Sequence, residues 1–290
     1  MEPAPPAPVA PSVYADSRIS LLTQHGKEQV IAPILGGTTG CLIEHVTTYD
    51  TDLFGTFTRD IPRVGSQLDA ARAKARKGME LSGFEQGVAS EGSFGRDPLM
   101  GLFPCNTEIV VLIDASRDLE IIGVAEGKSN LAHLLTADWD AVMVLAERVK
   151  FPDHHLVLRP DGQEDPRIRK GIATWAQLQT AFDWALSQSD SGMVFLETDV
   201  RAHTNPTRMQ MIGLATKDLA RKLISLCPEC QTPGFGKVKR VPGLPCRMCG
   251  APTKGTLAQV HGCLKCSHTF TVEVAESRDA DARFCDYCNP

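Results

Sequence analysis

Four pairs of cysteines near the C-terminus constrain this chain more than any other feature of its sequence. Each pair has the form Cys-x-x-Cys, and together they account for eight of the ten cysteines: Cys227/Cys230, Cys246/Cys249, Cys263/Cys266 and Cys285/Cys288. Two thiolates two residues apart in a tight turn can bind one metal ion, and two such turns complete the tetrahedral coordination that zinc prefers. We therefore predict two structural zinc ions bound by these eight cysteines.

The spacing leaves open which pairs share a metal ion. Taken in chain order, the pairs give C-x2-C-x15-C-x2-C and then C-x2-C-x18-C-x2-C, both typical of four-cysteine zinc sites. A cross-braced arrangement of the pairs is the alternative. Disulfides are disfavoured because the first residues, Met-Glu-Pro-Ala-Pro-Pro, do not resemble a secretion signal, so we expect reduced thiols in a cytoplasmic protein. Four regular pairs also favour zinc over an iron–sulfur cluster or a redox-active pair.

Length, hydropathy and charge narrow the class of protein further. The 290 residues suffice for about two domains, and no uninterrupted run of about 18 apolar residues exists, so we expect a soluble protein without a membrane partner. Residues 1–220 contain 20 Lys and Arg against 29 Asp and Glu, a balance of -9, whereas residues 221–290 contain 10 against 6, a balance of +4. The overall charge of -5 therefore conceals an acidic part and a basic part.

The apolar pattern divides the chain into three segments. Residues 1–16 are rich in Pro and Ala and have no apolar period, so we expect a disordered tail that contributes nothing to the fold. Residues 17–226 alternate between strand and helix patterns, which is typical of an α/β domain. Residues 227–290 are expected to form a tandem four-cysteine zinc-ribbon domain.

The expected elements of the α/β domain follow from the apolar periods and the capping residues. Helices are predicted over residues 27–35, 67–81, 138–149, 175–187 and 206–226. Strands are predicted over residues 19–23, 41–46, 87–90, 108–113, 119–126, 155–159 and 193–198. Thr174 and Asn205 are the expected N-caps of the last two helices.

Three short motifs in this domain contain residues suited to a phosphorylated ligand. The first strand ends in Thr-Gln-His-Gly-Lys, residues 23–27, where a glycine turn, helix N-terminal amides and a lysine can receive an anion. Asp69 stands in the first turn of the helix at 67–81, and Glu91 follows the strand at 87–90 before a glycine. A carboxylate at the exit of a strand suits a metal- or substrate-binding loop. An ordinary turn and a solvated helix face are the structural alternatives.

These motifs, in this order, resemble the inosine triphosphate pyrophosphatase superfamily, which includes the Maf-like branch. Residues 23–27 are similar to its Thr-Asn-Pro-x-Lys turn, residues 69–76 to its helix Glu-Asn-Ala-x-x-Lys-Ala-Arg, and residues 88–92 to its strand-end acidic segment. The resemblance covers roughly residues 18–225 and implies a mixed sheet flanked by helices. The whole chain also resembles an uncharacterised bacterial family of this length with the same zinc tail.

The resemblance implies a metal-dependent hydrolase that releases pyrophosphate from nucleoside triphosphates. Lys27, Asp69 and Glu91 would be the catalytic residues, with Mg²⁺ bound by the two carboxylates and water oriented by Glu91 or Glu44. The residues expected to bind the substrate are Thr23, Gln24, His25, Arg59, Arg201 and Arg208.

A second class of function remains open. The α/β domain could retain only a vestigial anion pocket, while the zinc ribbons bind nucleic acid or protein. The acidic pair favours the hydrolase, because a phosphate pocket gains nothing from carboxylates unless a metal intervenes, whereas the basic zinc tail favours the binding protein. The expected partners are therefore a phosphorylated nucleotide and, through the ribbons, nucleic acid or protein, and a homodimer is left open.

Overall fold

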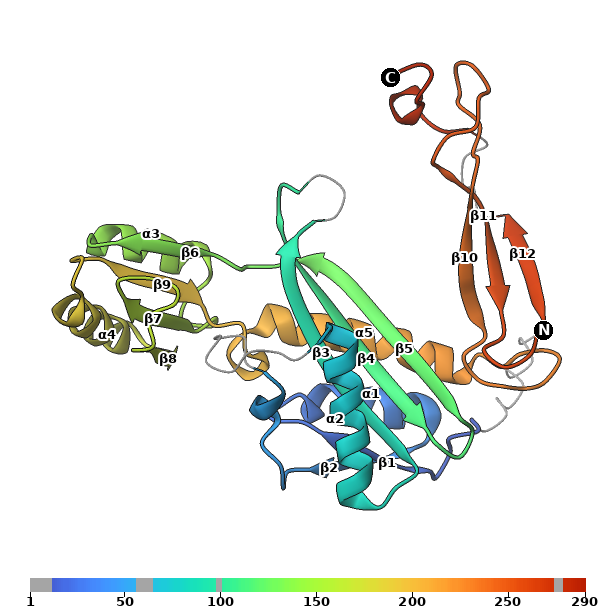
Figure 1. The fold of residues 1–290 in the computed structure, drawn as a ribbon, viewed down its shortest axis with the longest axis horizontal. Coiled ribbons are helices and arrows are strands. Elements are labelled where there is room, and N and C mark those ends of the chain that lie inside the picture. The colour runs from blue at the N-terminus through green and yellow to red at the C-terminus, as the bar shows by residue number, and fades with distance from the viewer. Residues whose placement is uncertain (1–11, 56–64, 98–100, 274–278) are drawn as a thin grey trace, which may run out of the picture. The chain divides into compact units, whose positions relative to one another are not determined.

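The chain forms two compact units in the computed structural model, Met1–Ala220 and Arg221–Pro290 (Figure 1). The structure describes residues 12–55, 65–97, 101–273 and 279–290. The boundary between the units falls within the last long helix, six residues before the boundary expected at residue 226. Among the described helices, none is long and apolar enough to cross a membrane.

The first unit contains a five-stranded mixed sheet with the strand order β2-β1-β3-β4-β5. Its strands are β1 (Arg18–Leu22), β2 (Leu42–Val46), β3 (Gln86–Arg96), β4 (Pro104–Asp114) and β5 (Leu119–Lys128). β1 pairs in parallel with both β2 and β3, whereas β3, β4 and β5 form an antiparallel meander. From β1 the chain passes to β2 on one side of β1, and later to β3 on the other side. The C-terminal end of β1 is therefore the point at which the strand order reverses direction.

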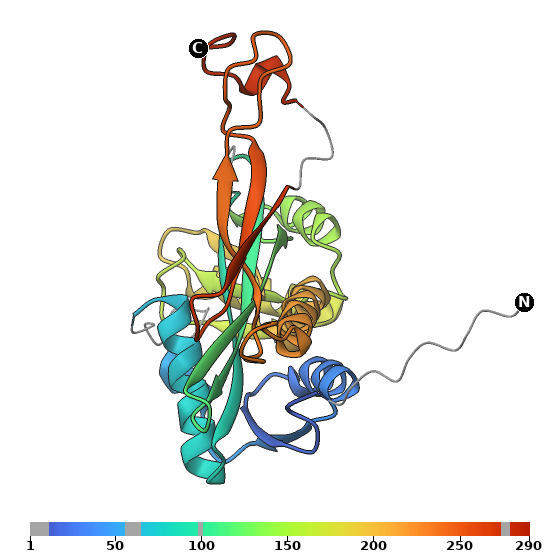
Figure 2. The same ribbon diagram turned by 90° about the vertical axis from the view of Figure 1, so that its right-hand side faces the viewer.

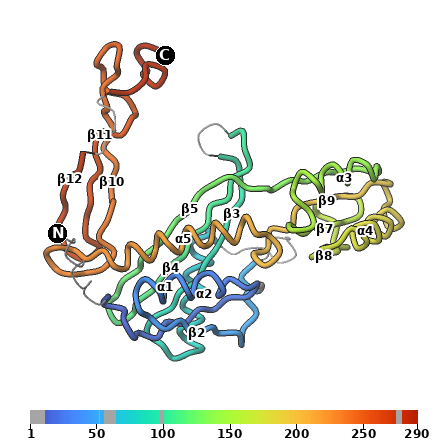
Figure 3. The backbone as a smooth tube through the Cα atoms, turned by 180° about the vertical axis from the view of Figure 1, so that it is seen from behind, coloured from blue at the N-terminus to red at the C-terminus, as the bar shows by residue number. Residues whose placement is uncertain are grey.

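Three helices cover the two faces of this sheet: α1 (Glu28–Thr39), α2 (Gln67–Ser82) and α5 (Pro206–Ile224). α2 lies on one face, with α1 and α5 together on the other (Figures 1 and 3). The close approach of α2 requires a glycine in β3, because a β-carbon at Gly87 would lie 2.6 Å from the Ala75 carbonyl oxygen. Ala71 and Ala75 of α2 are fully buried against the sheet and lie four residues apart on one face of the helix.

A second, four-stranded sheet completes the first unit, with the order β6-β9-β7-β8. Its elements are β6 (His133–Thr136), α3 (Trp139–Arg148), β7 (Leu156–Pro160), β8 (Arg169–Ile172), α4 (Trp175–Gln188) and β9 (Val194–Thr198). Apolar residues of both helices and of the strands share one core. The helices and strands predicted in residues 17–226 are present, and Thr174 and Asn205 accept the expected capping bonds from Gln177 N and Arg208 N. β6 and β8 were not predicted, because each has only four residues. In addition, the sequence of β8, Arg-Lys-Gly-Ile, does not alternate between apolar and polar residues.

The expected N-terminal tail is wrong for its last residues. Tyr14 is fully buried, and the backbone carbonyl of Val13 accepts a hydrogen bond of 3.3 Å from the Arg117 guanidinium. Burial raises the pKa of the Tyr14 hydroxyl, and the neighbouring Asp114 carboxylate adds to this effect. Residues 12–16 therefore belong to the fold, whereas residues 1–11 lie outside the described residues.

The second unit is a three-stranded antiparallel sheet with cysteine-bearing loops at both ends (Figure 2). Its strands are β10 (Gly236–Pro242), β11 (Thr256–Gly262) and β12 (Thr269–Glu273). β10 and β11 pair from Gly236↔Gly262 at one end to Pro242↔Thr256 at the other. The first and third cysteine pairs flank the first end, and the second pair lies in the loop that closes the other end.

Candidate functional site

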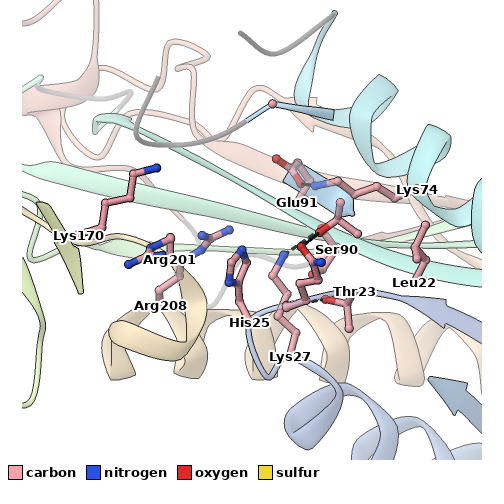
Figure 4. A pocket seen from close by; sticks show the side chains of 13 residues that line it. Leu22, Thr23, His25, Lys27, Lys74, Ser90, Glu91, Lys170, Arg201 and Arg208 are labelled. Atoms are coloured by element: carbon pink, nitrogen blue, oxygen red, sulfur yellow. Dashed lines mark hydrogen bonds and ion pairs between the residues drawn. The ribbon is translucent and has the colours of Figure 1, made fainter. Parts of the chain in front are cut away.

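A pocket lined by cationic side chains lies at the C-terminal end of β1 (Figure 4). β1 ends there while its neighbour β3 continues with Ser90 and Glu91, so the side chains of several elements can converge. The charged residues that line the pocket are Lys27, Lys74, Lys170, Arg201, Arg208 and Glu91. The ends of parallel strands at a reversal of strand order are the usual ligand site of open α/β sheets.

Lys27 is the most unusual of these cations because it is buried without a carboxylate partner. Only 6% of the residue is exposed, and its ammonium donates a hydrogen bond of 3.3 Å to the Ser90 carbonyl oxygen. Within the described chain it forms no ion pair. Burial, followed by the charges of Arg208 and Lys74, lowers the pKa of Lys27 to about 7. The folded protein therefore holds an ammonium group whose charge an anion in the pocket would stabilise.

Lys74 and Glu91 form a buried ion pair on the α2 side of the pocket. Lys74 Nζ lies 2.7 Å from Glu91 Oε2, and the two residues are 8% and 2% exposed. Breaking such a pair by removing one charge costs roughly 3–5 kcal/mol. Glu91 was predicted as a site residue, but Lys74 was not. The sequence did contain a clue to Lys74, because this lysine lies beside Ala71 and Ala75 on the apolar side of the helix.

Arg208 and Glu108 form a second buried pair on the other face of the sheet. Arg208 Nε donates to Glu108 Oε1 at 2.8 Å, and Arg208 Nη1 donates to the Val200 carbonyl at 2.7 Å. Gly92 makes room for this pair, because a β-carbon there would overlap Glu108 Oε1 and lie 2.8 Å from Arg208 Nη2. The strand end and loop predicted after residue 90 are wrong, because β3 continues to Arg96. Gly92 lies within the strand and makes room for the arginine.

Arg201 and His25 also line the pocket, and the His25 ring stacks on His203 beside it. Arg201 is held by Asp199, with Nη2 2.6 Å from Oδ2 and Nε 3.0 Å from Oδ1. The His25 and His203 rings stack at 4.8 Å between centroids. Burial, then the charges of His25 and Arg201, lowers the pKa of His203, so the stack favours the neutral imidazole. His25 has a positive φ of 69°, which bends the chain between β1 and α1.

Most of the predicted substrate-binding residues converge on this pocket. Thr23, Gln24, His25, Arg201 and Arg208 line it together with Lys27. Thr51 donates a hydrogen bond of 3.1 Å to Gln24 Oε1 and orients that amide. Arg59 lies outside the described residues.

Asp69 does not line the pocket, contrary to its predicted catalytic role. Its carboxylate accepts hydrogen bonds from Ser66 N and Ser66 Oγ at 3.0 and 2.7 Å, forming the capping box of α2. It also lies 3.6 Å from Arg72 Nη1. Hydrogen bonds from the Ser66 hydroxyl and amide lower the pKa of Asp69. Glu44, the alternative base, is likewise absent from the pocket and pairs with Arg18 on the sheet edge.

The residues at the pocket do not fit the predicted magnesium ion. Glu91 is the one carboxylate among the described lining residues, and it is already paired with Lys74. Among the described residues, the two cysteine groups alone bring three or more potential ligands together. Mg²⁺ is usually bound through one or two carboxylates at about 2.0–2.1 Å, and the predicted second carboxylate, Asp69, belongs to the capping box of α2.

Replacing Asp69 by Ala is expected to destabilise α2 without affecting ligand binding in the pocket. Ser66 remains the N-cap in this variant, and the loss of the Asp69 carboxylate from the capping box should lower the free energy of unfolding by about 0.3–1 kcal/mol. Thermal denaturation measures the first effect, and calorimetric titration with a nucleoside triphosphate measures the second. A loss of binding in a variant that remains folded would restore Asp69 to the site.

The eight C-terminal cysteines form two interleaved clusters instead of two consecutive ones. One contains Cys227, Cys230, Cys263 and Cys266, and the other contains Cys246, Cys249, Cys285 and Cys288. In each cluster all four sulfur atoms lie within 4.8 Å of one another. The cross-braced alternative is thus confirmed, and the tandem arrangement is wrong.

The sulfur geometry of both clusters fits a tetrahedral zinc ion. Sulfur–sulfur distances are 3.7 Å for Cys227–Cys266, 3.5 Å for Cys230–Cys263, 3.9 Å for Cys246–Cys288 and 3.7 Å for Cys249–Cys285. Zinc with four sulfur ligands at about 2.3 Å requires edges of about 3.8 Å. A disulfide requires about 2.0 Å, so these cysteines are free thiols placed at ligand distance.

Backbone amides in the tight turns also favour the thiolate form that a metal requires. Met248 N donates to Cys246 Sγ at 3.4 Å, and Lys265 N donates to Cys263 Sγ at 3.3 Å. Hydrogen bonds from the backbone amides of Cys249 and Met248 lower the pKa of Cys246 to about 7. These residues can therefore hold two zinc ions, one at each end of the β10–β11 ribbon.

One family of proteins matches most of the chain, from residue 74 to residue 290, and its description is Domain of unknown function (DUF6671). The chain belongs to this family. The DUF6671 match includes Lys74, Glu91, Arg208 and all eight clustered cysteines, but it begins after the turn at residues 23–27. It gives no support to the resemblance to inosine triphosphate pyrophosphatases. No curated protein and no solved structure matches this DUF6671 chain.

Proposed function

We propose that the α/β unit binds a phosphorylated nucleotide or a related phosphorylated molecule, with its phosphate groups in the pocket at the end of β1. The observation that carries the proposal is the buried ammonium of Lys27, which lines the pocket together with Arg201 and Arg208; the carboxylates that pair with the two arginines do not line it. Buried cations are costly unless they are paired, and Lys27 has no ion pair within the described chain. A phosphate anion would supply the missing negative charge.

The surrounding groups suit phosphate better than a carboxylate ligand. Arg201 and Lys170 line the outer part of the pocket, while Lys27 lies deeper and is nearly fully buried. The buried Ser90 hydroxyl has no hydrogen-bond partner in the part of the chain that the structure describes, so it can donate to a ligand oxygen. Several cations and a hydroxyl around one pocket match the several oxygens of a phosphate or pyrophosphate group.

Hydrolysis of the bound nucleotide is a second candidate function. The position of Glu91 in the pocket favours it. Its carboxylate is the one acidic group among the described residues of the pocket, where it could orient a water molecule. Attack of that water on the α-phosphorus, with its proton passing to Glu91, would form one P–O bond and break the bridging P–O bond to the β-phosphate, so that a nucleoside monophosphate and pyrophosphate leave. The resemblance of residues 23–27 and 88–92 to pyrophosphatase motifs supports this candidate, whereas the position of Asp69 does not.

Replacing Glu91 by Gln separates binding from hydrolysis. The Gln amide oxygen can still accept a hydrogen bond from Lys74, but loss of the buried charge should lower the free energy of unfolding by up to about 3–5 kcal/mol, so thermal denaturation first checks that the variant is folded. The folded variant should bind nucleoside triphosphates and lose at least 100-fold in pyrophosphate release. Calorimetric titration measures binding, and a coupled assay measures pyrophosphate with inosine, xanthosine and modified pyrimidine triphosphates. Undiminished release in the variant would remove Glu91 from catalysis. A wild-type protein that binds none of these ligands, nor pyrophosphate, would overturn the proposed function.

A further inference from the structure

One face of the β10–β11–β12 sheet combines cationic and aromatic side chains in cross-strand rows. Lys237, His261 and Phe270 are register partners across the three strands and therefore lie on the same face. Arg240, Gln259 and Val272 form the next row on that face, two residues farther along β11. We call these six residues the basic-aromatic face.

An irregularity in β10 places Arg240, in place of Lys239, on the same face as Lys237. The register shifts between Lys237 and Lys239, so one extra residue is accommodated there. Without this β-bulge, Lys237 and Arg240 would point to opposite sides, because side chains alternate along a strand. Lys239 is paired with Val260 and lies on the opposite face.

The aromatic rings are held in place by packing while one of them stays accessible. The His261 and Phe270 rings stack at 5.4 Å between centroids, with 13° between their planes. Phe235, which is 7% exposed, packs against both rings at 6.5 and 5.5 Å. Phe270 itself is 44% exposed. A fixed, accessible ring is suited to stacking because ordering it costs little further entropy.

The cations of β10 are exposed and carry charge that nothing described in this unit neutralises. Lys237, Lys239 and Arg240 form no ion pair with the described residues, so the positive charge on β10 is local to that strand. Other cations of the unit are paired, for example Lys254 with Asp286 at 3.0 Å. The charge on this face therefore suits a polyanion.

We propose that the basic-aromatic face binds single-stranded nucleic acid, with Phe270 stacking on a base and Lys237 and Arg240 contacting phosphates. Bases within a duplex already stack on each other, so an exposed aromatic ring gains contacts only with unpaired bases. Alternating cations and an aromatic ring at strand spacing match the alternation of phosphates and bases along a single strand. The proposal does not rest on the pocket of the α/β unit.

Fluorescence anisotropy of the full chain with a labelled single-stranded oligonucleotide tests the proposal. Phe270→Leu keeps the apolar packing on Phe235 but removes the ring, and is expected to weaken binding about tenfold, as loss of one stacked base does. Lys237→Ala should weaken binding and reduce the slope of log K against log salt by about 0.7, the value for one lost phosphate contact. Every variant should retain the two zinc ions of the wild-type protein, which controls for folding.

Lys239→Ala is the matched control, because it removes the same charge from the same strand on the opposite face. It should change the affinity by less than about twofold. Equal effects of Lys237→Ala and Lys239→Ala, or an unchanged affinity of Phe270→Leu, would show diffuse charge attraction and overturn the proposal. The proposal would also be overturned if the protein did not bind the single strand, bound a duplex equally tightly, or bound poly-glutamate but not the oligonucleotide.

Discussion

Replacing Cys227 and Cys266 together by serine is expected to remove one zinc ion and leave the other, whereas replacing Cys227 and Cys249 is expected to remove both. The first two residues belong to one cluster, and the second two belong to different clusters. Pairing in chain order would give the reverse result for the two double variants. Zinc content after purification, measured by plasma mass spectrometry, distinguishes the two arrangements directly.

The structural effect of losing a zinc ion is expected to be large. Binding free energies of structural zinc are of order 10–16 kcal/mol and become folding free energy in small domains. The three-stranded sheet has little else to stabilise it, because β12 is exposed along its whole length. We expect chelation of both ions to unfold the second unit, seen as loss of dispersed amide signals in NMR spectra.

Cys105→Ser is the control for the cysteine variants. Cys105 is a free thiol in the first unit and belongs to neither cluster, so the variant should contain two zinc ions and show unchanged NMR signals from the second unit. Retention of both ions in the Cys227 and Cys249 double variant would contradict the interleaved arrangement. Retention of the second unit's fold after complete removal of zinc would contradict the structural role of the metal.

Replacing Lys27 by Met is expected to abolish anion binding and to raise the stability of the folded protein. The pKa of Lys27 is lowered from 10.5 to about 7, so the folded state disfavours the charged form. The unfolded chain binds the proton more tightly between these two pH values, so wild-type stability rises with pH across that range. Removing the lysine should therefore stabilise the protein most at pH 7 and below, and progressively less toward pH 10.5.

The same substitution tests the pH dependence of ligand binding. Sulfate keeps its charge from pH 6 to 9, so changes in its affinity over that range report on the protein. The wild-type affinity should fall as pH rises through about 7, because Lys27 loses its charge, and the Met variant should bind weakly at every pH. Thermal denaturation and calorimetric titration measure the two effects. Lys217→Met removes an exposed cation outside this pocket and should change neither.

A Lys27→Met variant that loses stability at pH 7 and still binds sulfate would contradict the role given to this residue. Loss of both stability and binding would indicate that the ammonium mainly supports the fold through its bond to Ser90. A gain in stability with loss of binding is the combination expected of a residue retained for its ligand.

The motif at residues 23–27 shows how far sequence reasoning reached in the pocket. A glycine turn between a strand and a helix, followed by a lysine, predicted an anion site, and the structure places Thr23, Gln24, His25 and Lys27 at one pocket. The role of Asp69 could not be inferred in the same way. A carboxylate in the first turn of a helix can cap that helix or bind a ligand, and the choice depends on where the helix points.

The partners of Lys74 and Arg208 show what the linear pattern omits. Lys74 meets Glu91 across 17 residues, and Arg208 meets Glu108 across 100. Such contacts arise only when helices pack on a sheet, because sequence periodicity describes one element at a time. The same limit applies to Lys170, which no local motif identified and which lines the pocket.

The sequence alone determined the local features: the alternation of strands and helices, the N-caps Thr174 and Asn205, and the eight cysteines able to bind zinc. Each of these depends on residues within a few positions of one another, where spacing limits geometry. The tertiary structure alone decided which cysteine pairs share a metal. β10 and β11 run antiparallel, so the loop before β10 and the loop after β11 meet at one end, and pairs far apart in the chain become neighbours in space.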